Sequence, residues 1–201
     1  MNRERSPDSS KPSSEATVIT LIDQSDEELA QVACGDRNAF AVLYRRHVTD
    51  IYRFLLVRVG KVQDAEDITT QTFEAALQHI AGYQGIGKFK SWLLGIARRK
   101  AADHFRQKRV TLPLEFAQHI PHPDTPLDEC IDQQLRLELV ASLLHRLTPE
   151  RSEALALRLF GRLTIAEVAH VMGKSEAAVK MLVHRAMSDL KQQLTNSQKE
   201  N

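Results

Sequence analysis

Apolar side chains recur every three or four residues through most of this chain, which is the spacing that places them on one face of an α-helix. Polar capping residues and glycines interrupt the pattern and divide it into separate helices. No segment shows the alternation of apolar and polar residues that is typical of a half-buried strand. The pattern predicts an all-α protein, with helices near residues 26–34, 37–59, 65–80, 91–109, 130–147, 149–160, 165–172 and 176–194.

The predicted helix boundaries rest on local capping signals. Ser25 precedes Glu28 by three residues, which is the spacing of a capping box at the start of a helix. Asp36 and Asp64 are each expected to cap a further helix with their side-chain oxygens. Gly60 is expected to end the helix that Asp36 begins, because glycine adopts the left-handed conformation of a helix C-terminus without steric cost.

The C-terminal part of the chain has the punctuation of a helix-turn-helix. Thr164 and Glu167 form a second capping box, and Gly173 ends the short helix that follows. Ser175 can cap the next helix, on which the basic residues point away from the apolar face. Two short helices joined by a glycine turn can place the second helix in the major groove of DNA. The basic residues of this second helix are Lys180, His184 and Arg185.

A second candidate surface for nucleic acid lies in the helix that Ser91 is expected to open and in the glycine-containing loop before it. Residues 88–109 carry eight lysines and arginines, and Tyr83, Phe89 and Trp92 lie at the start of this region. Cations bind phosphates, while aromatic faces stack on unpaired bases with about 1–3 kcal/mol each. The same aromatic residues could instead fill a hydrophobic core, and composition does not choose between the two roles.

Composition and charge are those of a globular protein. Apolar residues make up 42% of the 201 residues and charged residues 26%. The net charge is only +1, but the basic stretch 88–109 and the acidic stretch 124–138 cancel in the sum without cancelling in space. No apolar run approaches the roughly 20 residues needed to cross a membrane, and the N-terminus lacks the apolar core of a secretion signal. A cytoplasmic location without membrane insertion is therefore expected.

The chain is expected to form two helical domains joined by a flexible linker. Residues 1–20 are rich in serine, proline and charge, which predicts a disordered tail. Four prolines and several acidic residues between 111 and 130 predict a flexible acidic linker, because prolines at this density discourage helix formation. The helices of residues 21–110 and of residues 131–197 would then form the two domains.

The sequence shows no arrangement of residues for bond chemistry. It contains no catalytic carboxylate pair, phosphate-binding glycine loop or nucleophile elbow, so we expect neither enzyme activity nor a cofactor. Cys34 and Cys130 lie far apart and are expected to be reduced thiols. A zinc site that combines Cys130 with His119 and His122 is the alternative, but a structural zinc site needs four convergent ligands, and no metal is expected.

Four strings occur in a defined order along the chain: GDRNAFAVLYRRH (35–47), DAEDITTQTFEAAL (64–77), FKSWLLGIARRKAADHFRQKR (89–109) and LTPERSEALALRLFGRLTIAEVAHVMGKSEAAVKMLVHRAMSDL (147–190). The proline-rich stretch separates the third string from the fourth. In this order the strings resemble the extracytoplasmic-function (ECF) sigma factors of bacterial RNA polymerase, and the resemblance covers about residues 26–194. It implies a domain like sigma region 2 followed by a helix-turn-helix domain like sigma region 4.

The resemblance further implies a factor that binds core RNA polymerase, recognises a promoter and helps to separate its strands. The surface that it implies for core polymerase consists of Asp64, Glu66, Asp67, Thr70, Gln71 and Glu74. The residues that it implies for the minus-ten element and for melted, single-stranded DNA are Tyr83, Lys88, Phe89, Lys90, Trp92, Arg98, Arg99, Arg106 and Arg109. The residues that it implies for the double-stranded minus-thirty-five element are Ser175, Glu176, Ala177, Lys180, Met181, His184 and Arg185.

Other interpretations are compatible with the sequence. A polymerase-independent helix-turn-helix regulator would use the first domain for dimerisation or sensing, although it has no need of a surface for melted DNA. Under the family resemblance, an anti-sigma factor is the expected inhibitor, because it could hold the two domains together and mask both DNA surfaces. The acidic linker could instead shield the basic helix within the same molecule, and salt should then relax the compact form.

Overall fold

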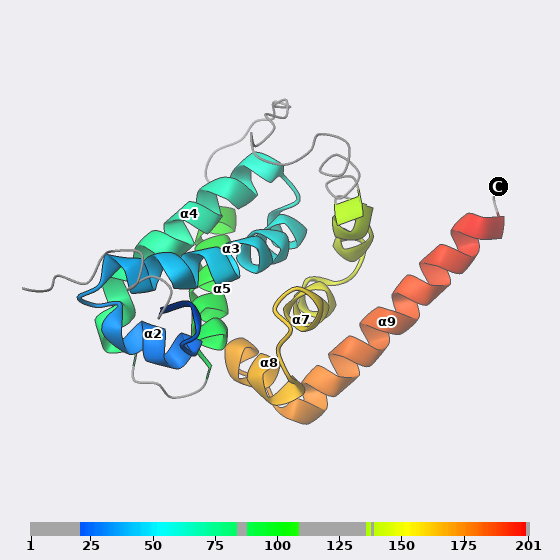
Figure 1. Cartoon of the computed structure of the whole chain (residues 1–201). Helices are drawn as coiled ribbons and strands as arrows, with labels where there is room; N and C mark the ends of the chain where they lie inside the picture. Colours follow the sequence, from blue (N-terminus) through cyan, green and yellow to red (C-terminus); the bar gives the residue numbers. More distant parts are fainter. Residues whose placement is uncertain (1–20, 84–87, 109–135, 138, 200–201) are drawn as a thin grey trace, which may run out of the picture.

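The computed structural model of the chain describes residues 21–83, 88–108, 136–137 and 139–199, and every regular element in these ranges is helical (Figure 1). The all-α class predicted from the sequence is confirmed. The predicted tail, the predicted linker at 111–130 and Arg109 lie outside the described residues. The elements are α2 (Asp26–Val32), α3 (Arg37–Val59), α4 (Val62–His79), the 3₁₀ turn η1 (Ile80–Gly82), α5 (Phe89–Lys108), α7 (Pro149–Leu159), α8 (Ile165–Met172) and α9 (Glu176–Lys199), and residues 139–145 are also helical.

The N-terminal half is a bundle in which α3 packs against α2, α4 and α5, while α4 also packs against α5. Its core includes Phe54 of α3 and Leu93 of α5, both of which are fully buried. Two buried threonines on α4, Thr69 and Thr72, donate hydrogen bonds of 2.7 Å to the carbonyl oxygens four residues earlier. These bonds satisfy the hydroxyls, so the polar side chains fit into the apolar interface of α4.

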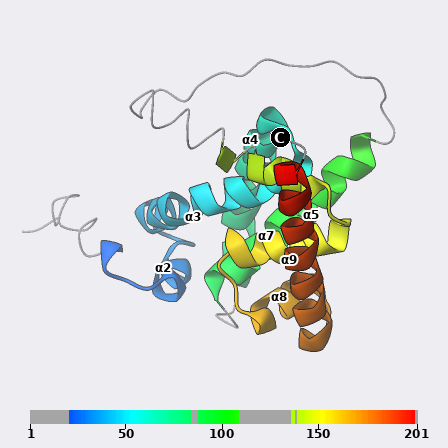
Figure 2. The ribbon, with the colours of Figure 1, turned by 90° about the vertical axis from the view of Figure 1, so that its right-hand side faces the viewer.

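The C-terminal half consists of α7, α8 and α9, which pack against one another in all three pairs. Val179 and Ala186 are fully buried on the inner face of α9. Farther along, α9 extends away from the rest of the molecule as a long helix (Figure 1), and in Figure 2 it lies in front of the other helices. The first turns of α9 are therefore held against the body of the protein. No helix among the described residues is long and apolar enough to span a membrane.

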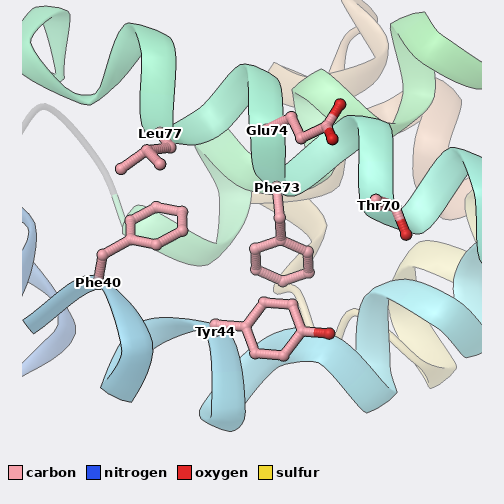
Figure 3. Close-up of a pocket in the computed structure, with 6 residues that line it drawn as sticks. All are labelled: Phe40, Tyr44, Thr70, Phe73, Glu74 and Leu77. Atoms are coloured by element: carbon pink, nitrogen blue, oxygen red, sulfur yellow. The ribbon is translucent and has the colours of Figure 1, made fainter. Parts of the chain in front are cut away.

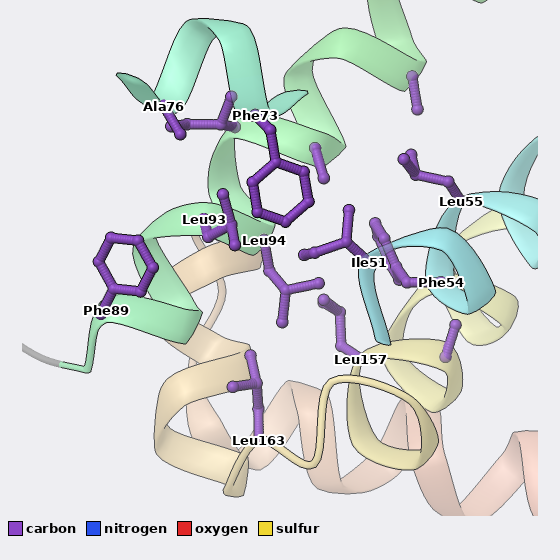
Figure 4. Packing of buried hydrophobic residues seen from close by; sticks show 14 of the residues in the cluster. Ile51, Phe54, Leu55, Phe73, Ala76, Phe89, Leu93, Leu94, Leu157 and Leu163 are labelled. Carbon is purple, nitrogen blue, oxygen red and sulfur yellow. The ribbon is translucent and has the colours of Figure 1, made fainter. Parts of the chain in front are cut away.

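The two halves contact each other directly, α3 against α7 and α5 against α8. Leu94 of α5 is fully buried and lies beside Leu157 and Leu163 of the C-terminal half (Figure 4). A Cβ atom at Gly161 would lie 2.8 Å from Leu94 Cδ1, so the glycine permits the close approach of α5 to the turn after α7. The buried residues of both halves form one continuous core.

Most of the predicted helix boundaries are confirmed. Ser25 and Glu28 form both hydrogen bonds of a capping box, and the Asp36 carboxylate accepts a 2.8 Å bond from the Asn38 N–H. Gly60 ends α3 with a φ of 74°, in the left-handed region. Side-chain capping signals of this kind act within a single helical turn, which explains why they can be identified from sequence.

Three local predictions are wrong. Helix α4 begins at Val62, so Asp64 lies inside its first turn and does not cap it. The negative charge of Asp64 still interacts favourably with the helix dipole there, and its carboxylate lies 3.4 Å from His104 Nε2. Helix α5 begins two residues before Ser91, whose hydroxyl is buried. Phe105, which helical spacing predicts to face the core, is 41% exposed because Ala101 is the last buried residue of α5.

Candidate nucleic-acid interface

The helix-turn-helix is built from α8, the turn at Gly173 and the first turns of α9. The Thr164 hydroxyl accepts the Glu167 N–H at 3.3 Å, and the Glu167 carboxylate accepts the Thr164 N–H at 2.6 Å, which completes the predicted capping box. Gly173 has a φ of 65°, and Ser175 Oγ accepts the Ala178 N–H at 3.2 Å at the start of α9. The turn geometry is therefore determined by residues that are adjacent in sequence.

The outer face of this second helix is open to solvent. Val179 and Ala186 anchor the helix to α7 and α8, and ion pairs within the C-terminal half support it. Arg151 of α7 contacts Asp189 of α9 at 2.6 Å, and Lys174 contacts Glu150 at 2.8 Å. All seven residues predicted to meet duplex DNA are exposed: Ser175, Glu176, Ala177, Lys180, Met181, His184 and Arg185.

The aromatic residues predicted to meet melted DNA form one cluster at the start of α5. The ring centroids of Tyr83, Phe89 and Trp92 lie 5.4–5.6 Å apart in each of the three pairs. Phe89 is fully buried, Tyr83 is 9% exposed and Trp92 is partly buried. In this conformation Phe89 supports the cluster from within, while the Trp92 side chain retains exposed surface.

The aromatic cluster rests on acidic and basic residues of α2 and α3. Asp26 contacts His47 Nε2 and Arg46 Nη1, each at 2.7 Å, and the His47 ring lies 5.7 Å from the ring of Phe89. The hydrogen bond with His47, together with Arg46, lowers the pKa of Asp26 to about 2 against the opposing effect of burial. The Phe89 N–H donates to Glu27 Oε1 at 3.3 Å.

The predicted DNA-binding cations on and next to α5 differ in whether they contact carboxylates of other helices. Lys90 is held by Asp50 at 2.6 Å within the N-terminal half. Arg98 contacts Glu153 at 2.7 Å, and Lys88 contacts Glu167 at 3.2 Å, and both of these acids belong to the C-terminal half. Arg99 is exposed, and so is Arg106, which pairs with Asp103 of its own helix. Several predicted DNA contacts are thus engaged by carboxylates in this conformation.

The residues predicted to dock core polymerase lie along α4. Glu66, Asp67, Thr70, Gln71 and Glu74 are exposed, whereas Asp64 is partly buried. Part of this face borders a shallow groove between α3 and α4, lined by Phe40, Tyr44, Thr70, Phe73, Glu74 and Leu77 (Figure 3). The rings of Tyr44 and Phe73 pack edge to face, 4.7 Å apart, along the groove. The exposed surface of α4 therefore combines acidic residues with apolar ones.

Sequence reasoning missed the residues that connect the two halves. Arg58, near the end of α3, approaches Glu153 at 3.9 Å, and the Glu153 side chain is only 8% exposed. An acidic residue within the apolar run of α7 was the available signal, because a buried carboxylate requires a cationic or hydrogen-bonding partner. The identity of that partner depends on packing between elements that are distant in sequence.

Two family models match the chain in the order of its two halves. Sigma-70 region 2 matches residues 43–111, and Sigma-70 region 4 matches residues 137–190. The matched residues include α4, α5 and the complete helix-turn-helix. The two family models thus cover the exposed α4 face, the aromatic cluster and the outer face of α9.

Similar proteins include two ECF RNA polymerase sigma factors and one solved complex. The ECF RNA polymerase sigma factor SigM of Bacillus subtilis is 30% identical over 151 residues, which cover 74% of this chain and 91% of that protein. The ECF RNA polymerase sigma factor BldN of Streptomyces coelicolor is 34% identical over 82% of this chain, but the match spans only 63% of BldN. The structure of CnrH in complex with the cytosolic domain of CnrY aligns with a TM-score of 0.68 and 26% identity, over 86% of this chain and 99% of CnrH.

Proposed function

Since this chain belongs to the ECF family of RNA polymerase sigma factors, we propose that it binds core RNA polymerase and directs it to specific promoters. In this proposal the outer face of α9 enters the major groove of the minus-thirty-five element. The cluster around Trp92 and the cations of α5 hold the separated strands of the minus-ten element. A sigma factor performs no bond chemistry of its own, because the polymerase makes the RNA, so we place its action beside the polymerase in the cytoplasm.

The observation that carries this proposal is the presence of two different candidate DNA surfaces on one chain. The exposed face of α9 carries cations on a rigid helix, which suits the phosphates and base edges of a duplex. The start of α5 combines cations with an aromatic cluster, which suits unpaired bases. A protein that only binds duplex DNA has no need of the second surface.

We assign core binding to the exposed face of α4. Its acidic side chains, with the neighbouring groove between α3 and α4, offer charge and apolar surface to a basic partner protein. The acidic residues of this face, Glu66, Asp67 and Glu74, are all exposed. The face is therefore free for a partner in this conformation.

Reconstitution tests the proposed function directly. The full chain is mixed with core RNA polymerase, promoters are selected from a random DNA library, and run-off transcripts are measured with and without the chain. We expect stable core binding and initiation that depends on both the chain and the selected sequence. Absence of core binding together with absence of promoter-dependent initiation would overturn the proposal and favour the polymerase-independent regulator.

A protein inhibitor is part of the proposal. CnrH, whose structure aligns with most of this chain, was solved in complex with the cytosolic domain of CnrY. We propose that an anti-sigma factor binds this chain and holds it in an inactive form. Affinity purification of the tagged chain from its own host, followed by mass spectrometry, should recover such a partner. A chain that is purified without a partner and is fully active at all times would contradict this part.

A further inference from the structure

Met181 lies at the centre of the outer face of α9, the face that the proposed function places in the major groove. Val179, two residues earlier, is fully buried. Successive residues of an α-helix are about 100° apart around its axis, so Met181 lies about 160° from Val179 and points away from the body of the protein. Met181 is 51% exposed. A long apolar side chain therefore projects from the middle of the proposed surface for duplex DNA.

Exposure alone does not give Met181 a role, because single apolar side chains are common on protein surfaces. Met187 of the same helix is 53% exposed as well. It lies six residues later, about 9 Å along the helix axis and about 120° around it, and so lies on the side of the helix instead of the centre of the outer face. The two methionines are equally exposed, and only their positions distinguish them.

The neighbours of Met181 give the middle of the outer face an apolar character. Ala177, one helical turn earlier on the same face, is exposed and presents only a methyl group. Leu182 packs against the core and takes no part in this face. Lys180 and His184, which are both exposed, lie beside Met181. The outer face thus has an apolar centre, formed by Ala177 and Met181, with basic residues next to it.

The apolar centre does not contribute to the core among the described residues. Met172, at the end of α8, is buried in the core, whereas Ala177 and Met181 belong neither to the core nor to the side chains packed against it. A substitution at Met181 therefore reports on what the outer face contacts and not on the packing of the helix-turn-helix.

The major groove offers one apolar group that is specific to a base, the 5-methyl group of thymine. The other groups on the base edges are hydrogen-bond donors and acceptors, which a thioether side chain satisfies poorly. Such a group loses its water without a compensating hydrogen bond when an apolar side chain covers it. The flexible, apolar side chain of Met181 is therefore best matched to a thymine methyl group.

We propose that Met181 is a specificity-determining residue that contacts the 5-methyl group of a thymine in the minus-thirty-five element. The inference rests on the proposed function, in which α9 enters the major groove, and it names a base that this face selects. The thymine can belong to either strand, because both bases of a pair present an edge in the major groove. The cations beside the apolar centre supply affinity through phosphates, while the methyl contact supplies part of the sequence preference.

Replacement of thymine by deoxyuridine tests the proposal, because it removes the methyl group and leaves base pairing unchanged. Each thymine in the minus-thirty-five element of the promoter selected with the reconstituted holoenzyme, on either strand, is replaced in turn. Binding of the wild-type holoenzyme to each duplex is measured by competition at constant salt. We expect deoxyuridine to weaken binding at one or more positions by about four-fold, the ratio that corresponds to burial of one methyl group. No weakening at any position, or a selected element without thymine on either strand, would overturn the proposal.

The variant Met181→Ala shows whether this side chain makes the methyl contact. We expect its holoenzyme to bind the thymine and deoxyuridine duplexes equally well, whereas Met181→Leu, which keeps an apolar side chain of similar volume, should retain the preference. The matched control is Met187→Ala, because Met187 is equally exposed on the side of the same helix and its removal should leave the four-fold preference unchanged. A preference for thymine that survives in Met181→Ala would contradict the proposal, since another group would then contact the methyl.

Three further measurements keep the test decisive. If circular dichroism shows that Met181→Ala does not fold, the wild-type series decides alone, because it requires no substitution in the protein. Binding of Met181→Ala to core polymerase is measured without DNA, and reduced binding would place the side chain against a protein and overturn the inference. Transcription from the selected promoter is measured with the wild-type holoenzyme. Normal initiation without a methyl preference would remove the inference and leave the proposed function intact, whereas absence of promoter-dependent initiation would overturn both.

Discussion

Asp26 Oδ2 lies 2.7 Å from His47 Nε2, and the imidazole side chain is 7% exposed. This pair joins α2 to α3 directly beside Phe89, and Arg46 closes the other side of the carboxylate. The acid is thus held by two cationic or hydrogen-bonding partners in a partly buried position. Its ionisation contributes to the stability of the half that carries the aromatic cluster.

The first prediction concerns this carboxylate. The pKa of Asp26 is about 2 in the folded protein and 3.8 ordinarily, so its contribution is present above about pH 4 and is lost as the pH falls through the folded value. Asp26→Asn should therefore lower the free energy of unfolding by about 2 kcal/mol at pH 7. Urea unfolding at a series of pH values should show this difference shrink toward pH 2. Asp23→Asn, at an exposed position, is the control, and a difference that stays constant across this range would contradict the assignment.

The second prediction compares two glycines. Nothing lies within 4 Å of a Cβ atom at Gly95 in α5, so Gly95→Ala should stabilise the protein by about 0.5–1 kcal/mol through helix propensity. A Cβ atom at Gly161 would lie 2.4 Å from the Leu157 carbonyl oxygen, so Gly161→Ala should destabilise the protein by about 1–3 kcal/mol. Thermal unfolding measures both. Equal effects of the two substitutions would show that the close approach at Gly161 carries no energetic weight.

The third prediction separates strand opening from duplex binding. Trp92→Ala removes the aromatic face with exposed surface from the cluster, so holoenzyme should still bind the duplex promoter but open it poorly. Permanganate reactivity of unpaired thymines reports opening, and gel shift reports duplex binding. Phe105→Ala, at an exposed aromatic position on the same helix, is the control and should behave as wild type. Normal opening by Trp92→Ala would exclude a stacking role for this residue.

The fourth prediction concerns the helix-turn-helix. Lys180→Ala and Arg185→Ala on the open face of α9 should each weaken promoter binding. Where the lost contact is to a phosphate, the slope of log affinity against log salt should fall by about 1. Where the lost contact is to a base, the preference for that base at the contacted promoter position should become weaker instead. Lys191→Ala, farther along α9, should leave the affinity near that of wild type, and an equal loss for all three variants would indicate a nonspecific charge effect.

The fifth prediction concerns core docking. Glu66 and Asp67 are both exposed on α4. Charge reversal at either position should weaken the affinity for core polymerase, measured by competition with another sigma factor, by about ten-fold, which corresponds to about 1.4 kcal/mol. Each position is reversed separately, and Asp23→Lys supplies the same change of charge away from α4. If the α4 variants compete as well as wild type, the docking surface lies elsewhere on the molecule.

Local sequence signals were sufficient for the helices and for most of their ends. Capping boxes at Ser25 and Thr164 and the left-handed glycines at 60 and 173 involve residues within one or two turns, so no distant contact is needed to form them. The signal failed at Asp64, because a capping residue two or three positions inside a helix start gives the same pattern as one at the start. It also failed at Phe105, because helical spacing does not show which side chains of α5 are covered by other helices.

For the candidate site, the sequence predicted which residue types occur together but not which side chains are exposed and can reach DNA. It identified cations and aromatic residues around α5 and left open whether the aromatic residues fill a core. The structure divides that group, because Phe89 is fully buried while Trp92 retains exposed surface. Burial depends on what packs against a residue from other helices, and helical spacing within α5 does not contain that information.

The sequence by itself determined an all-helical chain with a helix-turn-helix near its C-terminal end, since periodicity and capping are properties of neighbouring residues. Only the tertiary structure decided that Arg98 meets Glu153, 55 positions away, and that the Asp26–His47 pair supports Phe89. Charges attract without regard to sequence separation, and each of these residues has many possible partners of opposite sign. Packing of α3 against α7 and of α5 against α8 selects one of them.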